Sequence, residues 1–420
     1  MCFFWEHLQA CHLGELSLST SMTILLTGGR APGTLELARL LGAAGHRVIV
    51  AESARLHLCS RSRFVERAYR VPSPREQPTD YISALCRIME REQVHLLIPT
   101  CEEIFYVAQG KERLRSYGEV LTEGLDVLRS LHDKWLFGKL AREAGATVPN
   151  TVLSCSQEEL KQALREASGP VVLKPVYSRF AAHVRIVADP HTQVMDPLPE
   201  PSAEQPWLVQ EFIEGRQLCS YAVAHEGRLA LYSDYVTTYT AGQGASIYFA
   251  YANDPRVKDF VSRFVGRQRF SGQIAFDLIE SRQGELYVIE CNPRLTSGIH
   301  LFRGQKEAAN AFLQQGSEVI VPRETAPPSM LAMAMLTYGL GAIQDWSDLK
   351  RWGSDFFAAR DALYMPGDLW PYAAQFGMLA DLAWSSIRTG KSMIECSTED
   401  IEWNGEAPSV AEGSRFRKRM

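Results

Sequence analysis

Residues 272–294 read GQIAFDLIESRQGELYVIECNPR, and this stretch decides the fold of the chain. Its runs 274–279 and 285–291 carry the alternation and the aliphatic residues that are typical of β-strands. Residues 281–284 between the two runs are typical of a turn. The stretch therefore predicts a β-hairpin.

One face of the predicted hairpin carries polar side chains. If the pairing centres on the turn, Asp277 and Glu290 become diagonal neighbours across the strands, and the period of two adds Asn292. Two carboxylates and an amide oxygen suit a hard cation such as Mg²⁺, which favours oxygen ligands and is commonly shared with substrate phosphates. Arg294 would point a positive charge at the same place. The alternative is a solvated hairpin face with scattered charges.

The opposite face of the hairpin is apolar. Ile274, Phe276 and Leu278 on the first strand would meet Tyr287 and Ile289 on the second. A register shifted by one residue would split the polar set between the two faces. We therefore expect one side of the hairpin to be anchored in a core and the other to offer oxygen ligands.

Length and composition indicate a multidomain globular protein. The 420 residues exceed the roughly 250–300 at which a single core stops growing, so we expect two or three domains. A net charge of −5 offers no field for a polyanion, so no nucleic-acid partner is expected. The nine cysteines include no CxxC pair and indicate thiols in a reducing compartment rather than disulfides or a zinc site.

The longest apolar runs do not predict a membrane segment. The run 330–343 is shorter than the roughly 20 residues that span a bilayer, and Gln375 and Asp381 interrupt the run 369–387. We expect both to be packed helices, and we expect no membrane partner. Residues 1–22 are predicted to be a poorly ordered leader without the basic start of a secretory signal, so the expected location is the cytoplasm. Met22 is a candidate start.

The N-terminal part predicts a βαβ unit, with a strand at Thr23–Thr27, a helix at 34–44 and a strand at 47–51. The turn GGRAPG at 28–33 misses the GxGxxG spacing of a dinucleotide site, yet Glu52 ends the second strand where a ribose-binding acid would lie. An NAD oxidoreductase is therefore an alternative. The glycine spacing and the oxygen ligands of the hairpin argue against it.

Three further segments place polar groups where a ligand could reach them. A buried strand at 94–99 is followed by the loop residues 100–102, either a plain surface loop or part of a ligand crevice at a strand's carboxyl end. Lys134 opens a helix that runs to Glu143, and Lys174 ends the strand 171–174. The strand 207–212 runs into a short connection whose backbone groups could bond the edge of a flat heterocycle.

The remaining segments predict helices. Residues 254–270 form an amphipathic pattern, and Met-, Ala- and Trp-rich helices extend from about 322 to 387. Residues 396–420 are polar and are predicted to fray. The apolar side of the helix at 254–270 consists of Val257, Phe260, Val261, Phe264 and Val265.

The order of these parts over residues 23–323 resembles the ATP-grasp superfamily: a doubly wound domain, an Asp-Lys helix start, a strand ending in Lys, a QEFIEG hinge and D-x12-E-x-N-P-R. The resemblance implies an α/β fold with a Rossmann-like domain at 23–125 and an ATP-grasp domain at 126–325. The latter has two α+β subdomains, the small lid subdomain lying at about 145–213. A C-terminal helical extension with a polar tail would cover 326–420.

The resemblance also implies roles for individual residues in an ADP-forming C–N ligase. Two lysines would hold the ATP phosphates, hinge residues would contact adenine, and Mg²⁺ or Mn²⁺ would bind the hairpin. The residues in these implied roles are Lys134 and Lys174 at the phosphates, Gln210, Glu211 and Ile213 at adenine, Asp277, Glu290 and Asn292 at the metal, and Arg294, with Lys174, at the phosphorylated intermediate.

Two departures from the superfamily pattern concern the nucleotide. The loop 175–184 reads PVYSRFAAHV and lacks the glycines of a phosphate-cradling flap, so Ser178 or Arg179 would have to substitute through side chains. Gln217 stands where most members have a glutamate that accepts hydrogen bonds from the ribose. This change would weaken ATP affinity without abolishing it.

Within the superfamily the sequence is similar to the mycosporine-glycine synthase-like proteins, in the stretches LLTGGRAPGTLELARLLGAAGHRVIV, YRVPSP, LVQEFIEGRQLCS and YVIECNPR. That resemblance implies ligation of glycine to 4-deoxygadusol, an enolised ketone. The alternatives are another carboxylate–amine or dipeptide ligase and a non-catalytic nucleotide sensor. The oligomeric state stays open, with a homodimer among the alternatives.

Overall fold

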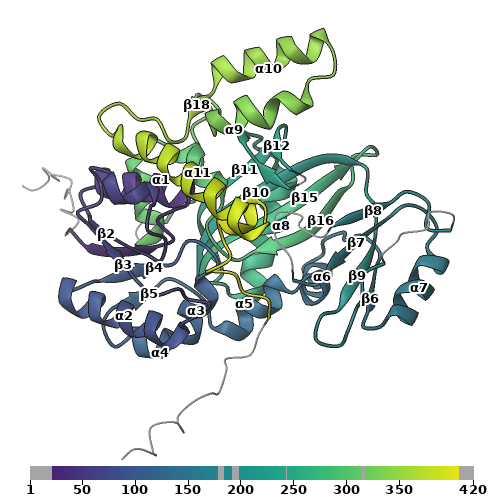
Figure 1. Cartoon of the computed structure of the whole chain (residues 1–420), viewed down its shortest axis with the longest axis horizontal. Helices are drawn as coiled ribbons and strands as arrows, with labels where there is room; N and C mark the ends of the chain where they lie inside the picture. The colour runs from purple at the N-terminus through teal and green to yellow at the C-terminus, as the bar shows by residue number, and fades with distance from the viewer. Residues whose placement is uncertain (1–20, 178–183, 192–197, 243, 315–316, 406–420) are drawn as a thin grey trace, which may run out of the picture.

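The computed structural model describes residues 21–177, 184–191, 198–242, 244–314 and 317–405. The predicted leader up to residue 20, the flap residues Ser178 and Arg179, and the tail beyond residue 405 lie outside the described residues. Three main sheets organise the rest of the chain (Figure 1).

The first sheet has five parallel strands in the order β3-β2-β1-β4-β5. Alternate residues of its central strands pack into two cores: Leu26 and Val50 belong to one, Leu25 and Ile49 to the other. Both faces are therefore covered, as a run of consecutive apolar residues in a parallel strand predicts. The elements are β1 (Thr23–Thr27), α1 (Pro32–Ala43), β2 (Arg47–Glu52), η1 (Leu58–Arg61), β3 (Arg67–Arg70), α2 (Pro78–Glu92), β4 (Leu96–Ile98), α3 (Ile104–Gln109), α4 (Lys111–Leu114) and β5 (Glu119–Val120).

A four-stranded sheet forms the lateral part of the molecule, in the order β6-β9-β7-β8 (Figure 1). Helix α7 (Gln157–Glu166) covers it and contributes Leu160 to a small core with Leu173 and Val209. The strands are β6 (Thr151–Ser154), β7 (Val171–Pro175), β8 (Arg185–Val187) and β9 (Trp207–Glu211).

The largest sheet has seven strands in the order β16-β15-β10-β11-β14-β17-β18. Helix α8 (Pro255–Gln268) packs on it and buries all five apolar residues that the sequence pattern assigned to its inner side. The other elements are α5 (Leu125–His132), α6 (Lys134–Glu143), β10 (Gly215–His225), β11 (Arg228–Val236), β12 (Thr240–Ala241), β13 (Ala245–Ser246), β14 (Tyr248–Tyr251), β15 (Gly272–Ser281), β16 (Leu286–Asn292), η2 (Ser297–Phe302), η3 (Lys306–Phe312), β17 (Ser329–Met330) and β18 (Arg360–Asp361).

The C-terminal helices differ from the prediction of two packed helices. The run 330–343 is divided among β17, α9 (Ala332–Thr337) and η4 (Gly339–Ala342), and both of its glycines lie in η4, beyond the end of α9. Helix α11 (Trp370–Thr389) leaves Trp384 68% and Ile387 79% exposed, because its apolar residues surround the helix and only one side contacts the body. Helix α10 (Trp346–Ala358) stands away from the sheets in Figure 1, and α12 (Met393–Cys396) follows α11.

The segment after α12 returns to the first sheet, so the prediction of a frayed tail is wrong for residues 397–405. Asp400 forms an ion pair with Arg30 at 2.6 Å. The Trp403 ring is 2% exposed and stacks on Phe105 at a centroid distance of 4.5 Å. Burial of one large aromatic ring thus anchors an otherwise polar segment.

No helix in the described ranges is both long enough and apolar enough to span a bilayer.

A buried ion pair joins α1 to the C-terminal region. Arg39 Nε donates to Asp368 Oδ2 at 2.8 Å, and both side chains are 1% exposed. The guanidinium also donates to the carbonyl oxygens of Ala362 and Leu363 at 3.0 and 2.8 Å. The arginine is therefore fully engaged by groups more than three hundred residues away in the sequence.

Asp368→Ala is expected to destabilise the fold by about 3–5 kcal/mol, because it leaves the Arg39 charge buried without its counter-ion. Thermal unfolding should show a lower midpoint than the wild type. Glu307→Ala is the matched control, because Glu307 pairs with Arg323 at 2.8 Å on the surface and exposed pairs contribute only about 0–1 kcal/mol. Equal midpoints for the two variants would contradict a stabilising role for the buried pair.

Candidate nucleotide and metal site

The hairpin of β15 and β16 contains a β-bulge that decides which face Glu290 occupies. Leu278 lies opposite Val288, but Asp277 lies opposite Glu290, so Ile289 is the extra residue. A regular alternation would give Glu290 the same orientation as Val288, which faces the core. The bulge reverses this parity, because one inserted residue flips the side chains beyond it. The two carboxylates are therefore direct cross-strand partners, not the predicted diagonal neighbours.

The same bulge corrects the predicted apolar face. Phe276 and Leu278 pack in the core with Val288 and Cys291, whereas the prediction had named Tyr287 and Ile289 as their partners. The predicted β15 residues are right. The predicted β16 residues are wrong, because the extra residue Ile289 changes which side chains of this strand face the core.

Asn292 completes the polar set. Its Nδ2 donates to Asp277 Oδ2 at 3.2 Å and to Glu290 Oε1 at 3.4 Å, and its Oδ1 accepts from Arg294 Nη2 at 3.3 Å. The two carboxylates offer oxygen ligands that suit a hard cation. The Asn292 amide would rotate to present its oxygen as a third ligand. Among the described residues, no group of three or more His, Cys, Asp and Glu side chains could hold a metal.

Two lysines, one from a helix and one from a strand of the four-stranded sheet, converge on Glu290. Lys134 is the first residue of α6, whose N-cap Asp133 accepts from the N–H groups of Trp135 and Leu136. Its Nζ lies 3.5 Å from Glu290 Oε2. Lys174 lies on β7, is 4% exposed, and has a pKa lowered to about 8 by burial although Glu290 opposes this shift. Two positive charges thus lie beside the negative charge of Glu290.

The pKa values of Asp277 and Glu290 are shifted in opposite directions by their surroundings. Burial and then the neighbouring Glu290 charge raise the pKa of Asp277. Burial alone would raise the pKa of Glu290 as well, but Lys134 and Lys174 outweigh it and lower that pKa. The pair therefore favours one negative charge on Glu290, and a divalent cation would favour a second on Asp277.

The loop after Lys174 is tied to the start of α6. Tyr177 Oη donates to Asp133 Oδ2 at 3.2 Å, and the Lys134 backbone N–H donates to Val176 O at 3.5 Å. These contacts bring the two lysine-bearing segments together across two sheets.

The hinge residues at the end of β9 and just after it are partly engaged within the four-stranded sheet. Gln210 Nε2 donates to Thr151 Oγ1 at 3.0 Å, and Glu211 Oε2 accepts from Asn150 Nδ2 at 2.9 Å. The backbone N–H groups of Glu211 and Phe212 donate to carbonyls of the same sheet region. Of the three residues predicted to contact adenine, Gln210 and Glu211 belong to β9, and Ile213 lies on the connection to β10.

Gln217 lies on the face of β10 that also carries Cys219, which pairs with Asp277. Just before it, the chain needs glycine, because a Cβ on Gly215 would lie 2.0 Å from Glu280 O. The close approach of β10 to β15 at residue 215 therefore requires glycine.

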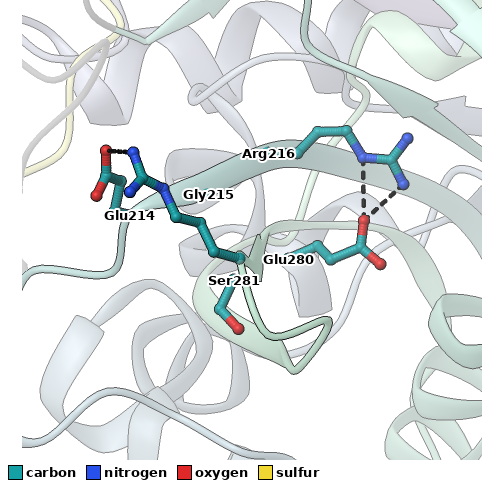
Figure 2. Close-up of a pocket in the computed structure, with 6 residues that line it drawn as sticks. Glu214, Gly215, Arg216, Glu280 and Ser281 are labelled. Atoms are coloured by element: carbon teal, nitrogen blue, oxygen red, sulfur yellow. Dashed lines mark hydrogen bonds and ion pairs between the residues drawn. The ribbon is translucent and has the colours of Figure 1, made fainter.

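A cavity of about 510 Å³ opens beside the hinge (Figure 2). Arg216 and Glu280 form an ion pair across it at 2.7 Å, and Glu280 also pairs with Arg256 of α8. These residues alternate with Gln217 and with Ile279, so they lie on the α8 face of the sheet. The cavity is therefore on the face opposite to the paired carboxylates.

The features that suggested a dinucleotide site have another role. Glu52 is buried and pairs with Arg30, and the same guanidinium pairs with Asp400. Burial favours a raised pKa for Glu52, but Arg30 outweighs it and the pKa is lowered. Gly28 has φ +72° and lies so close to the loop after β4 that a Cβ would be 2.6 Å from Thr100 Oγ1. The acid that a ribose would need is thus bound by Arg30, which the C-terminal segment holds through Asp400.

The loop after β4 reaches the hairpin, which favours the crevice interpretation over a plain surface loop. Glu102 Oε1 lies 4.0 Å from Arg294 Nη2. Glu103, which the sequence analysis did not single out, fixes this loop by accepting from Thr27 Oγ1, Thr100 N and Cys101 N at 2.6–3.0 Å.

Cys219 is a second residue that sequence reasoning missed. Its Sγ donates to Asp277 Oδ1 at 3.0 Å. The alternation on β10, which places residues 217 and 219 on one face, was a signal that could have found it.

Comparisons with known proteins identify the domain that carries these residues. Residues 131–298 match the family model of the ATP-grasp domain. No match was found among curated proteins. N5-carboxyaminoimidazole synthetase from Staphylococcus aureus, solved with ADP, has a TM-score of 0.56 at 14% identity, covering 73% of this chain and 80% of that one.

Two other ligase structures are similar. L-amino acid ligase from Bacillus licheniformis has a TM-score of 0.54 at 13% identity, covering 70% of this chain and 74% of that one. The biotin carboxylase domain of Hydrogenobacter thermophilus 2-oxoglutarate carboxylase, solved with MgADP, has a TM-score of 0.55 at 13% identity and covers 71% of both chains. The predicted fold class is confirmed: a parallel α/β sheet precedes an ATP-grasp domain, and helices follow it.

Proposed function

Because residues 131–298 match an ATP-grasp domain, we propose that the protein is an ADP-forming ligase that phosphorylates a carboxylate or an enolised ketone and condenses it with an amine. One observation carries the proposal: Lys134 and Lys174 converge on Glu290, which pairs with Asp277. Phosphoryl transfer depends mainly on positioning and charge stabilisation. The four groups supply both kinds of charge at one place.

The proposal assigns each residue a task. Lys134 and Lys174 bind the β- and γ-phosphates, and Asp277, Glu290 and Asn292 would hold Mg²⁺ or Mn²⁺, which neutralises phosphate charge when bound. Ile213 and the hinge backbone contact adenine, and Gln217 contacts the ribose. Residues 145–213 act as the lid that brings Lys174 to the phosphates, within the domain boundaries predicted from the sequence.

The reaction proceeds in two balanced steps. An oxygen of the acid or enol attacks the γ-phosphorus, the bond to the bridging oxygen breaks, and ADP leaves. Arg294 holds the negative charge of the resulting acyl or enol phosphate, next to Glu102. The amine nitrogen then attacks the activated carbon, the C–O bond to phosphate breaks, phosphate leaves, and the nitrogen loses a proton to solvent.

The substrate pair that we propose first is 4-deoxygadusol and glycine, because the sequence stretches named above resemble the mycosporine-glycine synthase-like proteins. The similar structures include a ligase named for L-amino acids. This likeness supports an amino acid as the amine, and other carboxylate–amine pairs are the competing choice.

ATP is expected to bind at least about tenfold more tightly in Mg²⁺ than in EDTA, because without the cation two carboxylates face the phosphates. Calorimetry on the purified protein measures both affinities. NAD(H) should give no binding heat, since Glu52 is buried and already pairs with Arg30. Equal ATP affinity in both buffers would remove the metal assignment, and an NAD(H) isotherm would revive the oxidoreductase alternative.

ADP release is expected to need both an oxygen substrate and an amine for its full rate. A phosphorylated intermediate that is shielded from water persists until an amine attacks it. A coupled assay for ADP, with mass spectrometry of the product, tests the pairs. ATP binding together with ADP release at the no-substrate level across a broad panel would favour the nucleotide sensor instead.

A further inference from the structure

Five neighbouring strands of the large sheet place one residue each in a single row. Glu290 lies opposite Asp277, Asp277 opposite Cys219, Cys219 opposite Tyr235, and Tyr235 opposite Tyr251. Directly opposed residues of neighbouring strands lie on the same face of a sheet. The row therefore runs from the paired carboxylates on β16 and β15 to Cys219 on β10 and to the tyrosines on β11 and β14.

Cys219 is the member of the row that contacts the Asp277 carboxylate from the sheet side. Its Sγ donates to Asp277 Oδ1 at 3.0 Å and lies 3.5 Å from Thr237 Oγ1. Tyr235 is buried behind it, in an apolar cluster with Phe249. The thiol is thus held in place by its neighbours while it faces the carboxylate.

The second carboxylate oxygen of Asp277, Oδ2, accepts a hydrogen bond from an amide rather than from a thiol. Asn292 Nδ2 donates to Asp277 Oδ2 at 3.2 Å. This bond is lost if the Asn292 amide rotates to offer its oxygen to a cation. The Cys219 bond requires no such rotation, so it is the one that persists when the site is loaded.

We propose that Cys219 is a positioning residue that orients the Asp277 carboxylate for a metal–nucleotide complex. The inference rests on the proposed function, since it needs the cation to bind Asp277. Mg²⁺ and Mn²⁺ bind well only when their ligands have the correct geometry. Partners that orient a metal ligand typically contribute about 10–100-fold to metal affinity.

The test measures Mn²⁺ binding by electron paramagnetic resonance, in the presence of a non-hydrolysable ATP analogue. Cys219→Ala should weaken Mn²⁺ binding by about tenfold. Cys219→Ser, which keeps a donor, should stay within about threefold of the wild type. Affinity for the analogue in EDTA should be the same in all proteins. Cys155→Ala is the matched control, because this half-buried cysteine lies in the four-stranded part of the molecule.

Comparing Cys219→Ser with Cys219→Ala separates the effect of the hydrogen bond to Asp277 from the effect of side-chain packing. If both variants weaken Mn²⁺ binding equally, or neither does, the proposal is overturned. Should Cys219→Ala fail to fold, Cys219→Val preserves the volume without the donor and should show the same tenfold loss. Asp277→Asn serves as the reference for a damaged ligand.

Failure of the inference and failure of the proposed function give different results. If the wild type binds no Mn²⁺ with the analogue, the proposed function fails and the inference with it. If the wild type binds, Asp277→Asn does not, and the donor-free variants match the wild type, the inference alone fails.

Discussion

Glu290→Gln is expected to lower the rate of ADP release by roughly 10²–10³-fold, which corresponds to about 3–4 kcal/mol of transition-state stabilisation. The change is nearly isosteric and removes the charge that Lys134 approaches at 3.5 Å and that Asp277 faces across the hairpin. Steady-state ADP release measures the rate, and thermal unfolding should show that the fold is retained.

Glu285→Gln is the matched control for this variant. It makes the same substitution on the same hairpin, at an exposed residue next to the turn. Its rate should equal that of the wild type. If Glu290→Gln kept most of the wild-type ADP release, the catalytic site would have to lie elsewhere.

Lys174→Ala is expected to weaken ATP binding by about tenfold or more and to lower turnover further, because a buried positive charge facing the phosphates is lost. The residue is 4% exposed, and the other residues of β7 carry no charge that could take its place. Calorimetry gives the affinity, and the ADP assay gives turnover.

Lys161→Ala provides the comparison, because Lys161 is an exposed lysine on α7 that covers the same four-stranded sheet. It should leave both quantities unchanged. Equal ATP affinity in Lys174→Ala and the wild type would contradict the phosphate role.

The lowered pKa of Lys174 predicts the sign of a pH effect. With a pKa of about 8 the lysine is charged below that pH and neutral above it. The affinity for ATP in EDTA should therefore fall as the pH rises through about 8 in the wild type. Lys174→Ala should lose this component of the pH profile, and an unchanged profile in the variant would assign the titration to another group.

Much of the fold could be predicted from local pattern. The inner side of α8 follows from a clear helical period, and β1 follows from an apolar run between a polar and a glycine-rich segment. Alternation placed Glu290 on the polar face, but the bulge at Ile289 could not be predicted, so Tyr287 and Ile289 were wrongly assigned to the core face. The hairpin pattern and then the resemblance placed Glu290 in the predicted ligand set, and the bulge is what gives it this orientation.

Contacts between distant segments explain the other differences. Trp403 is one of few apolar residues in a polar stretch, and its burial depends on Phe105, about three hundred residues earlier. The apolar residues of α11 looked like those of a packed helix, but nothing in its sequence says which side meets the body. Cys219 was missed because its role depends on the register between β10 and β15.

The most direct test of the account is a crystal structure of the protein with ADP and Mn²⁺. We predict an anomalous Mn²⁺ peak at coordination distance, about 2.0–2.2 Å, from the carboxylates of Asp277 and Glu290, with the ADP phosphates beside Lys134 and Lys174. A nucleotide bound instead between Gly28 and Glu52, or a Mn²⁺ peak away from the hairpin, would contradict it.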